Sequence, residues 1–220
     1  MTDEKTAILS VPLDVTAIAR LVFERGVGQA RIDGDAGPLS LLDAVFDGPA
    51  HVLADKGTVS IRYPRIASAP RPRSELSLSR FVSWSIEAQG GLAGVTAILA
   101  DIRLRSLLVA GGAHDLALVL RRPAGTVPIC IGGGVTDLFL RRPASVPVRI
   151  TVRGGASDLV LDDHHLEAVG GACRWQSPGF DAAVARYDIE IAGGVAGMKL
   201  TADATLVSDV IARPQHAALS

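Results

Sequence analysis

A chain of 220 residues is long enough to bury a sizeable core, as one large domain or two small ones. The formal net charge of −1 gives no overall field that would attract nucleic acid, and two cysteines are too few for a disulfide framework. No apolar run approaches the roughly 18 residues of a transmembrane segment, and the acidic start at Asp3 and Glu4 does not resemble a signal peptide. We therefore expect a cytoplasmic protein that does not bind nucleic acid.

Residues 1–65 are predicted to form an N-terminal cap and degenerate β-repeats. Within them, Thr16–Glu24 is too short to decide between a short helix and a strand. The glycine-rich stretch at residues 26–34 lacks the Lys-Ser/Thr pair of a phosphate loop, so we interpret it as a degenerate first repeat. Residues 66–80 are rich in proline and arginine and are predicted to be a linker or a long loop. We favour a loop that crosses a continuous stack, because strand-like sequence resumes at Phe81.

Residues 81–201 form a regular array built on one phrase, apolar-x-Gly-Gly-small-x-x-apolar-x-apolar. Its steps are 21, 22, 21, 16 and 23 residues, and periods near 20 residues are typical of stacked supersecondary units. The phrase begins at Ala88, Val109, Ile131, Val152, Ala168 and Ile191. The remaining residues, 202–220, are predicted to be a C-terminal capping tail, because an open strand edge promotes association.

Each unit of the array is predicted to contain two strands and two corners. The Gly-Gly corner is expected to supply positive φ, and the Arg-Arg-Pro-Ala corner ends the preceding strand. Period-two alternation predicts inward columns of apolar side chains. One column comprises Leu116, Leu138, Leu159, Trp175 and Met198, a second Leu118, Leu140, Leu161 and Leu200, and a third Val109, Ile131, Val152 and Ile191.

The predicted fold is therefore an all-β β-solenoid of stacked repeats of about 21 residues with two strands each. The alternative is an antiparallel β-sandwich whose hairpins resemble one another, since short strands at regular spacing with Gly and Pro turns also suit that fold.

Two phrases resemble a known group of proteins. Gly154-Gly-Ala-Ser-Asp-Leu159 and Arg142-Pro-Ala-Ser-Val-Pro-Val148 are similar to phrases in the toast-rack and adhesin-like repetitive β-domains of actinobacterial type. The resemblance covers roughly Gly26 to Thr201. It implies a fold and not an activity, so it carries no catalytic residues to this chain.

Four arginines occupy the two Arg-Arg-Pro-Ala corners, which stacking would align into a basic ridge. Such a ridge suits a protein partner or peripheral contact with an anionic surface, although charged corners also prevent unwanted edge pairing. These candidate partner-binding residues are Arg121, Arg122, Arg141 and Arg142.

A second candidate partner site is the insertion at residues 177–186, because departures from a repeat often map to binding faces. Its candidate residues are Ser177, Phe180 and Asp181. Trp175, just before the insertion, could stack on a ligand, but its place in the repeat favours the core.

The densest titratable cluster is Asp162, Asp163, His164 and His165. Carboxylates and imidazoles can bind a divalent metal or act in acid–base chemistry. Because adjacent residues on a turn point in divergent directions, we interpret this cluster as a solvated corner. We predict no metal, no cofactor and no catalytic residue.

The predicted function is a non-enzymatic β-repeat scaffold or interaction module that binds a protein partner or self-associates. The alternative is a β-helix enzyme or binding protein acting on polysaccharide, since such enzymes use paired carboxylates. Asp115, Asp137 and Asp158 recur at one position of the phrase. We favour a turn role for them, because Asp in turns commonly bonds its own backbone.

Overall fold

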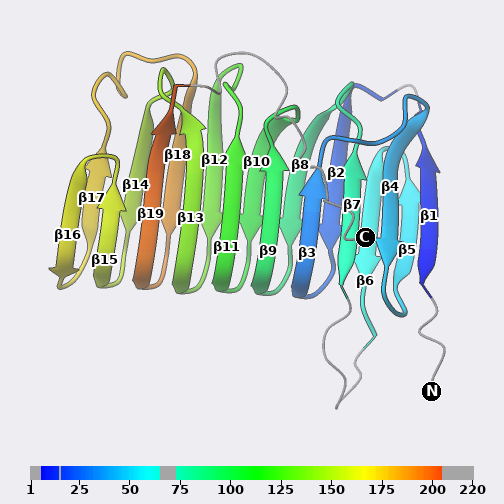
Figure 1. Ribbon diagram of the computed structural model, residues 1–220, viewed down its shortest axis with the longest axis horizontal. Helices are drawn as coiled ribbons and strands as arrows, with labels where there is room; N and C mark the ends of the chain where they lie inside the picture. The colour runs from blue at the N-terminus through cyan, green and yellow to red at the C-terminus, as the bar shows by residue number, and fades with distance from the viewer. Residues whose placement is uncertain (1–5, 15, 65–72, 205–220) are drawn as a thin grey trace, which may run out of the picture.

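The computed structural model describes residues 6–14, 16–64 and 73–204, and in these ranges the chain is all β, with no helix. Two mixed sheets lie face to face in an elongated row (Figure 1). The described strands of the front sheet are, in spatial order, β1 (Ala7–Pro12), β4 (Ser40–Phe46), β7 (Ser74–Leu78), β3 (Val27–Asp33), β9 (Leu92–Leu99), β11 (Ala113–Leu120), β13 (Val135–Pro143), β19 (Val195–Asp203), β15 (Ala156–Leu161) and β16 (His164–Val169).

The back sheet runs alongside in a matching order. Its described strands are β17 (Cys173–Gln176), β14 (Val148–Val152), β18 (Arg186–Ile191), β12 (Thr126–Ile131), β10 (Arg103–Val109), β8 (Ser83–Ala88), β2 (Ile18–Phe23), β6 (Thr58–Arg62) and β5 (His51–Asp55).

Neighbouring strands pair in parallel through the middle of both sheets, and the pairing is antiparallel only near the two ends. At one end β1 pairs with β4, β4 with β7, and β5 with β6, all antiparallel. At the other end β16 pairs antiparallel with β15, and β17 with β14. The two layers thus have parallel pairing inside and antiparallel pairing at both ends.

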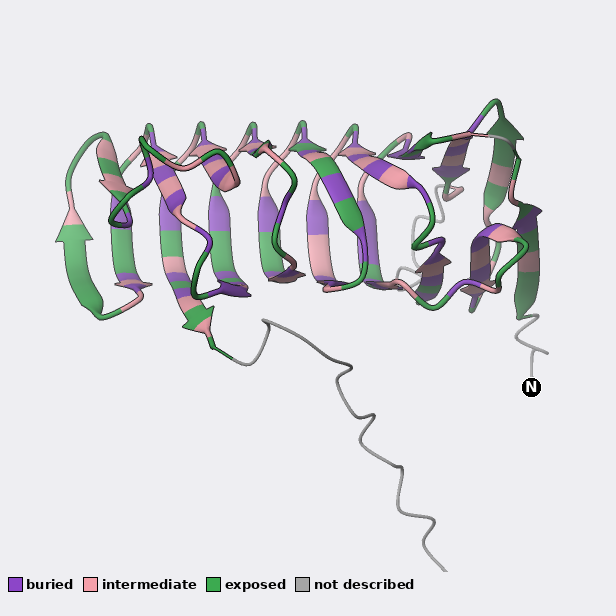
Figure 2. Cartoon of the chain, turned by 90° about the horizontal axis from the view of Figure 1, so that it is seen from above, coloured by how far each residue is buried: buried purple, intermediate pink, exposed green. Residues whose placement is uncertain are grey.

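The predicted columns are present in the pairing register. Leu116 lies opposite Leu138, Leu138 opposite Met198, and Met198 opposite Leu159. Val109, Ile131, Ile191 and Val152 align in the same way in the back sheet. Buried residues alternate with exposed ones along the strands (Figure 2), and one core cluster contains side chains from both sheets. Burying aliphatic side chains between the layers is the main stabilising contribution, at about 25 cal/mol per Å² of apolar surface.

The order of the units in space differs from their order in the sequence. The last pair, β18 and β19, lies between β12–β13 and β14–β15. Strand pairs that follow each other in the sequence are therefore separated in the sheets by the last pair of the chain. Strands β16 and β17 form the outer pair, and the insertion after Gln176 returns the chain across β14. The irregular steps of 16 and 23 residues reflect this detour.

The prediction for Trp175 is wrong in one respect. The phrase at Ala168 turns from the front sheet to the back sheet, whereas the other phrases turn from back to front. Trp175 therefore lies opposite Ile150 in the back sheet and not in the Leu116 column. It is partly buried against the core at the end of the row.

The explanation expected for the Gly-Gly corners is also wrong for all but one of them. Among the described corner glycines, Gly171 between β16 and β17 has a φ of 79°, and the glycines of the other corners do not have positive φ. Glycine is required there because neighbouring corners stack backbone against backbone. A Cβ on Gly193 would lie 2.5 Å from the amide nitrogen of Gly134, and one on Gly133 would lie 2.6 Å from that of Gly112.

Positive φ is found instead near one end of the front-sheet strands next to these corners, at a bulge that repeats across that sheet. These residues are passed over in the pairing register, and both Asp and Gly tolerate the left-handed conformation. The bulge column is Gln29, Gly94, Asp115, Asp137, Gly197 and Asp158. The recurring aspartates thus lie within strands, in a left-handed backbone conformation, and not in turns as predicted.

The N-terminal part belongs to the same core. β2 and β3 pair with β8 and β9, and the core cluster runs from Val11 to Leu200. Residues 18–23 form a strand, which decides between the two alternatives for that segment. The predicted loop at 66–80 is wrong for Ser74–Leu78, which is β7, because these residues pair with β3 and β4. Residues 1–5, 15, 65–72 and 205–220, and with them the first part of the predicted loop and most of the predicted tail, lie outside the described residues.

Candidate functional site

The arginine corners are not equivalent in space. Val119 lies opposite Arg141, so the second Arg-Arg-Pro sequence is shifted by two positions relative to the first. The cause is a difference in spacing: Arg121 and Arg141 are closer in sequence than Val109 and Ile131, which start their units. The predicted alignment into one ridge is therefore wrong.

Arg142 is buried, with 2% of its surface exposed. Its guanidinium binds Asp162 Oδ2 at 2.5 Å and the carbonyl oxygen of Pro143 at 3.3 Å. Burial lowers the pKa of Arg142, and the neighbouring Asp162 carboxylate opposes this shift. A buried ion pair of this kind holds the end of β13 against the β15–β16 turn and presents no charge to a partner.

The other corner arginines also contact their own chain. The Arg121 and Arg122 guanidiniums each donate one hydrogen bond, and Arg141 forms an ion pair. Their partners are the carbonyl oxygen of Asp101 at 3.3 Å from Arg121, Ser145 Oγ at 3.3 Å from Arg122, and the Asp203 carboxylate next to Arg141.

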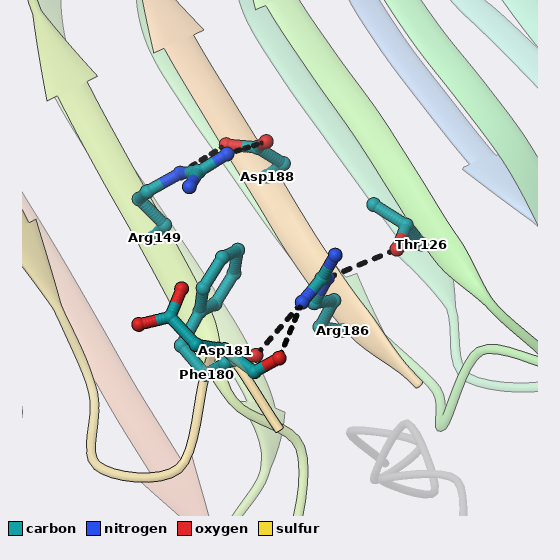
Figure 3. A network of polar contacts seen from close by, with 6 residues as sticks. All are labelled: Thr126, Arg149, Phe180, Asp181, Arg186 and Asp188. Atoms are coloured by element: carbon teal, nitrogen blue, oxygen red, sulfur yellow. Dashed lines mark hydrogen bonds and ion pairs between the residues drawn. The ribbon is translucent and has the colours of Figure 1, made fainter. Parts of the chain in front are cut away.

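The insertion is anchored by the first two of its candidate residues. Ser177 Oγ accepts a hydrogen bond from the Val148 N–H at 2.8 Å, and the Ser177 N–H donates to the Val148 carbonyl at 2.9 Å. Phe180 is 1% exposed, with the guanidinium carbons of Arg149 and Arg186 lying 4.6 and 4.8 Å from its ring centroid (Figure 3). Cation–π contacts on both sides hold the ring in place.

The two arginines that contact Phe180 are themselves fixed by the strands. Arg149 forms a two-point ion pair with Asp188 across β14 and β18, and hydrogen bonding to that carboxylate raises the pKa of Arg149. Arg186 donates to the carbonyl oxygens of Phe180 and Asp181 and to Thr126 Oγ1 (Figure 3). Asp181, which is exposed, accepts a hydrogen bond from Gln176. Two of the three candidates in the insertion, Ser177 and Phe180, are therefore anchors and not an open binding surface.

The titratable cluster at residues 162–165 is dispersed by the turn between β15 and β16. Asp162 pairs with Arg142, while Asp163 is exposed. His165 Nε2 lies 3.5 Å from Asp158 Oδ1, and the His164 ring lies 6.1 Å from the Trp175 ring. Within the described ranges, no group of three or more His, Cys, Asp or Glu side chains could hold a metal ion.

The bulge aspartates line a shallow groove on the outer face of the front sheet. Asp115, Asp137 and Asp158 are exposed there, together with Phe139 and Lys199. A Cβ on Gly197 would lie 2.9 Å from Asp137 Oδ1, so the Asp137 carboxylate lies over the space that this glycine leaves open. The aspartates thus lie side by side along one open, shallow groove.

Sequence reasoning missed the two ends of the row, where the inward faces of the outer strands are only partly covered. The partly buried apolar residues packed against the core gather there: Leu9, Leu13, Ala50, Val52 and Tyr63 at one end, and Val169, Cys173 and Trp175 at the other. The sequence signal for the end formed by β16 and β17 was the shortened 16-residue step, which marks where the chain turns back after β15.

The end of the row opposite β1 and β5 consists of the edge strands β16 and β17, and we call it the C-terminal end, although the last strand of the chain, β19, lies inside the row. Their inward residues lie opposite core residues of β15 and β14: Leu166 opposite Leu159, and Trp175 opposite Ile150. The His164–Trp175 ring contact joins the two sheets across this end. Leu166 is 36% exposed, and no described strand pairs with the outer edge of β16 or β17.

The two ends differ in how their edges are protected. β1 ends in Pro12, and its register shifts between Val11 and Pro12, which are features that discourage pairing with another chain. β16 contains no proline and no lysine, and its register with β15 does not shift, although Asp158 and Glu167 are passed over in the pairing. The back-sheet edge strands β5 and β17 both lack proline and lysine, so the difference between the ends lies in the front sheet, where β16 is the better candidate for a contact with another molecule.

Comparisons with known proteins agree with this architecture. The sequence matches no protein-family model and none of the curated proteins. A solved structure from Clostridium sporogenes, described as a "putative cell adhesion protein", is similar with a TM-score of 0.63 and 19% identity, covering 90% of this chain and 99% of that one. At this identity the likeness concerns the fold. In the residues that the structure describes, there is no helix that could cross a bilayer.

Proposed function

We propose that the protein is a non-enzymatic interaction module, built as a short β-solenoid with antiparallel strands at both ends. The parallel inner strand pairs, stacked with like residues over like residues, support the solenoid description. The similarity to a structure described as a cell adhesion protein supports an interaction role with a protein partner.

The observation that carries this proposal is the placement of the candidate chemical groups. Arg142 and Asp162 neutralise each other in a largely buried pair, Phe180 is an anchor, and Asp137 is a bulge residue on an open face. Arg142, Asp162 and Phe180 have structural partners, and the described surface offers to another molecule strand edges and partly covered apolar surface at the ends.

The test against the polysaccharide alternative uses the bulge column. Wild-type protein and the Asp137→Gly/Asp158→Gly variant are incubated with soluble neutral and acidic polysaccharides, and release of reducing ends is measured. We expect no release from either protein. Cleavage by the wild type that is lost in a variant with an unchanged melting temperature would overturn the proposal.

A further inference from the structure

We propose that the C-terminal end binds a second copy of this chain, with a two-fold axis that is perpendicular to both sheets and passes beside Leu166 and Trp175. In this arrangement β16 pairs antiparallel with the partner's β16, and β17 pairs with the partner's β17, so that each sheet continues into its counterpart. The inference rests on the proposed interaction function and names the partner of one end.

The two edge strands place Leu166 and Trp175 at the same distance from the corner between them. Leu166 precedes Gly170 by the same number of residues as Trp175 follows Gly171, and the Trp175 ring contacts the ring of His164, two residues from Leu166, so Leu166 and Trp175 occupy corresponding places in the two edge strands. A two-fold axis perpendicular to the sheets that passes beside Leu166, midway between Leu166 and its copy, therefore also passes close to Trp175 in β17. One rotation satisfies the pairing of both edges, which is the requirement for a closed, self-complementary interface.

The charges of β16 are complementary to those of β16 in a second copy. Antiparallel pairing centred on Leu166 places His165 of one copy opposite Glu167 of the other, and the symmetry repeats this pair. Both side chains are exposed, and a cross-strand pair between a carboxylate and an imidazole is favourable, whereas like charges directly opposite each other are not. In the same register Arg174 lies opposite Gln176, so no like charges meet in β17.

Contact with a second copy would cover apolar surface at the C-terminal end. Leu166, Val169, Cys173 and Trp175 line the inward side of this end and remain partly exposed. A second copy brings the same residues against them and completes the core between the sheets, as the units inside the row do for one another. The opposite end is less suited, because Pro12 and the register shift in β1 interrupt its edge.

The experiment measures mass by sedimentation over a wide concentration range for the full chain. The wild type is expected to rise to twice the monomer mass and to stop there. Leu166→Lys should remain at the monomer mass, and the same substitution at the other end, Leu53→Lys on the exposed outer position of β5, should behave as the wild type. Far-ultraviolet circular dichroism checks that each variant is folded.

The register is tested by exchanging charges. His165→Glu places two carboxylates opposite each other and should raise the dissociation constant at least tenfold. Adding Glu167→Lys restores opposite charges and should recover most of the loss. In a Trp84→Phe background Trp175 is the remaining tryptophan, and its emission should shift to shorter wavelength as the dimer forms.

Three outcomes would overturn the inference. A mass that keeps rising beyond two copies would indicate head-to-tail stacking. A wild type that stays monomeric and dimerises only when residues 205–220 are removed would show that the chain's own tail occupies this end. A monomer that binds a different protein through β16 would remove the second copy as partner while leaving the proposed interaction function intact, whereas polysaccharide cleavage would contradict that function independently.

Discussion

Arg142 shows how a residue chosen for its charge can serve the fold. The sequence places it in an Arg-Arg-Pro corner that reads as solvent-exposed, but the two-position shift in register carries it into an inward column near the end of β13. Its long side chain still reaches Asp162, so the charge is neutralised inside. Composition alone could not reveal this, because the shift depends on how far β13 continues before its turn.

The expected consequence is a large difference between substitutions in a buried and an exposed ion pair. Arg142→Met leaves the Asp162 carboxylate without its cation and should cost about 2 kcal/mol of unfolding free energy, less than for a fully buried pair because Asp162 retains some contact with water. Arg153→Met removes the ion pair with Glu190, whose two side chains are 64% and 45% exposed, and should cost no more than about 1 kcal/mol. Urea unfolding of both variants measures this, and equal costs would contradict the structural role of the buried pair.

The bulge column gives a second prediction for single residues. Asp137 has a φ of 56°, and the equivalent residues Gly94 and Gly197 are glycine. Asp137→Gly should therefore change stability by less than about 0.5 kcal/mol, while Asp137→Val should cost about 1–2 kcal/mol because a β-branched residue resists the left-handed conformation. Chemical denaturation distinguishes the two. If the glycine variant were as unstable as the valine variant, the carboxylate itself would be the stabilising group.

Among the structural elements, the Gly-Gly corners limit how closely successive units can stack. Gly193→Ala should cost about 2 kcal/mol or more, because its Cβ would lie 2.5 Å from a backbone nitrogen that cannot move without displacing the next corner. Gly125 is a matched control, since an added Cβ there meets nothing within 4 Å. Gly125→Ala should be neutral or slightly stabilising. Thermal melts of the two variants that coincide would argue against tight stacking of the corners.

The sequence predicted most features of the repeated units and few of the features that occur in one place only. Leu116 and Leu138, like Val109 and Ile131, align as expected because side-chain alternation and the Gly-Gly spacing fix their phase. The position of β18–β19 was not predictable, because equivalent apolar columns would accept either order of units. The role of Phe180 was misjudged for a similar reason: its two arginine contacts come from strands far apart in the sequence.

At the scale of the whole molecule, one core joins the N-terminal strands to the array. β8 and β9 pair with β2 and β3, and the indole of Trp84 donates a hydrogen bond to the carbonyl of Ser79. Residues 81–220 expressed alone should therefore lack a fixed environment for Trp84 and should aggregate. Near-ultraviolet circular dichroism and amide NMR dispersion provide the measurement. A well-dispersed spectrum with cooperative unfolding would show that the array is an independent domain.

The displaced position of β18–β19 also bears on how such a rod could change length during evolution. From β8 to β13 the units follow one another in space as they do in sequence, so duplicating one unit there would add about 4.8 Å and leave both ends intact. A duplication among β14 to β19 would instead have to pass through the detour, because the last unit is locked between two earlier ones. Growth by tandem duplication is therefore confined to the middle of the molecule, and related proteins of different length should differ in the number of central units while keeping both ends.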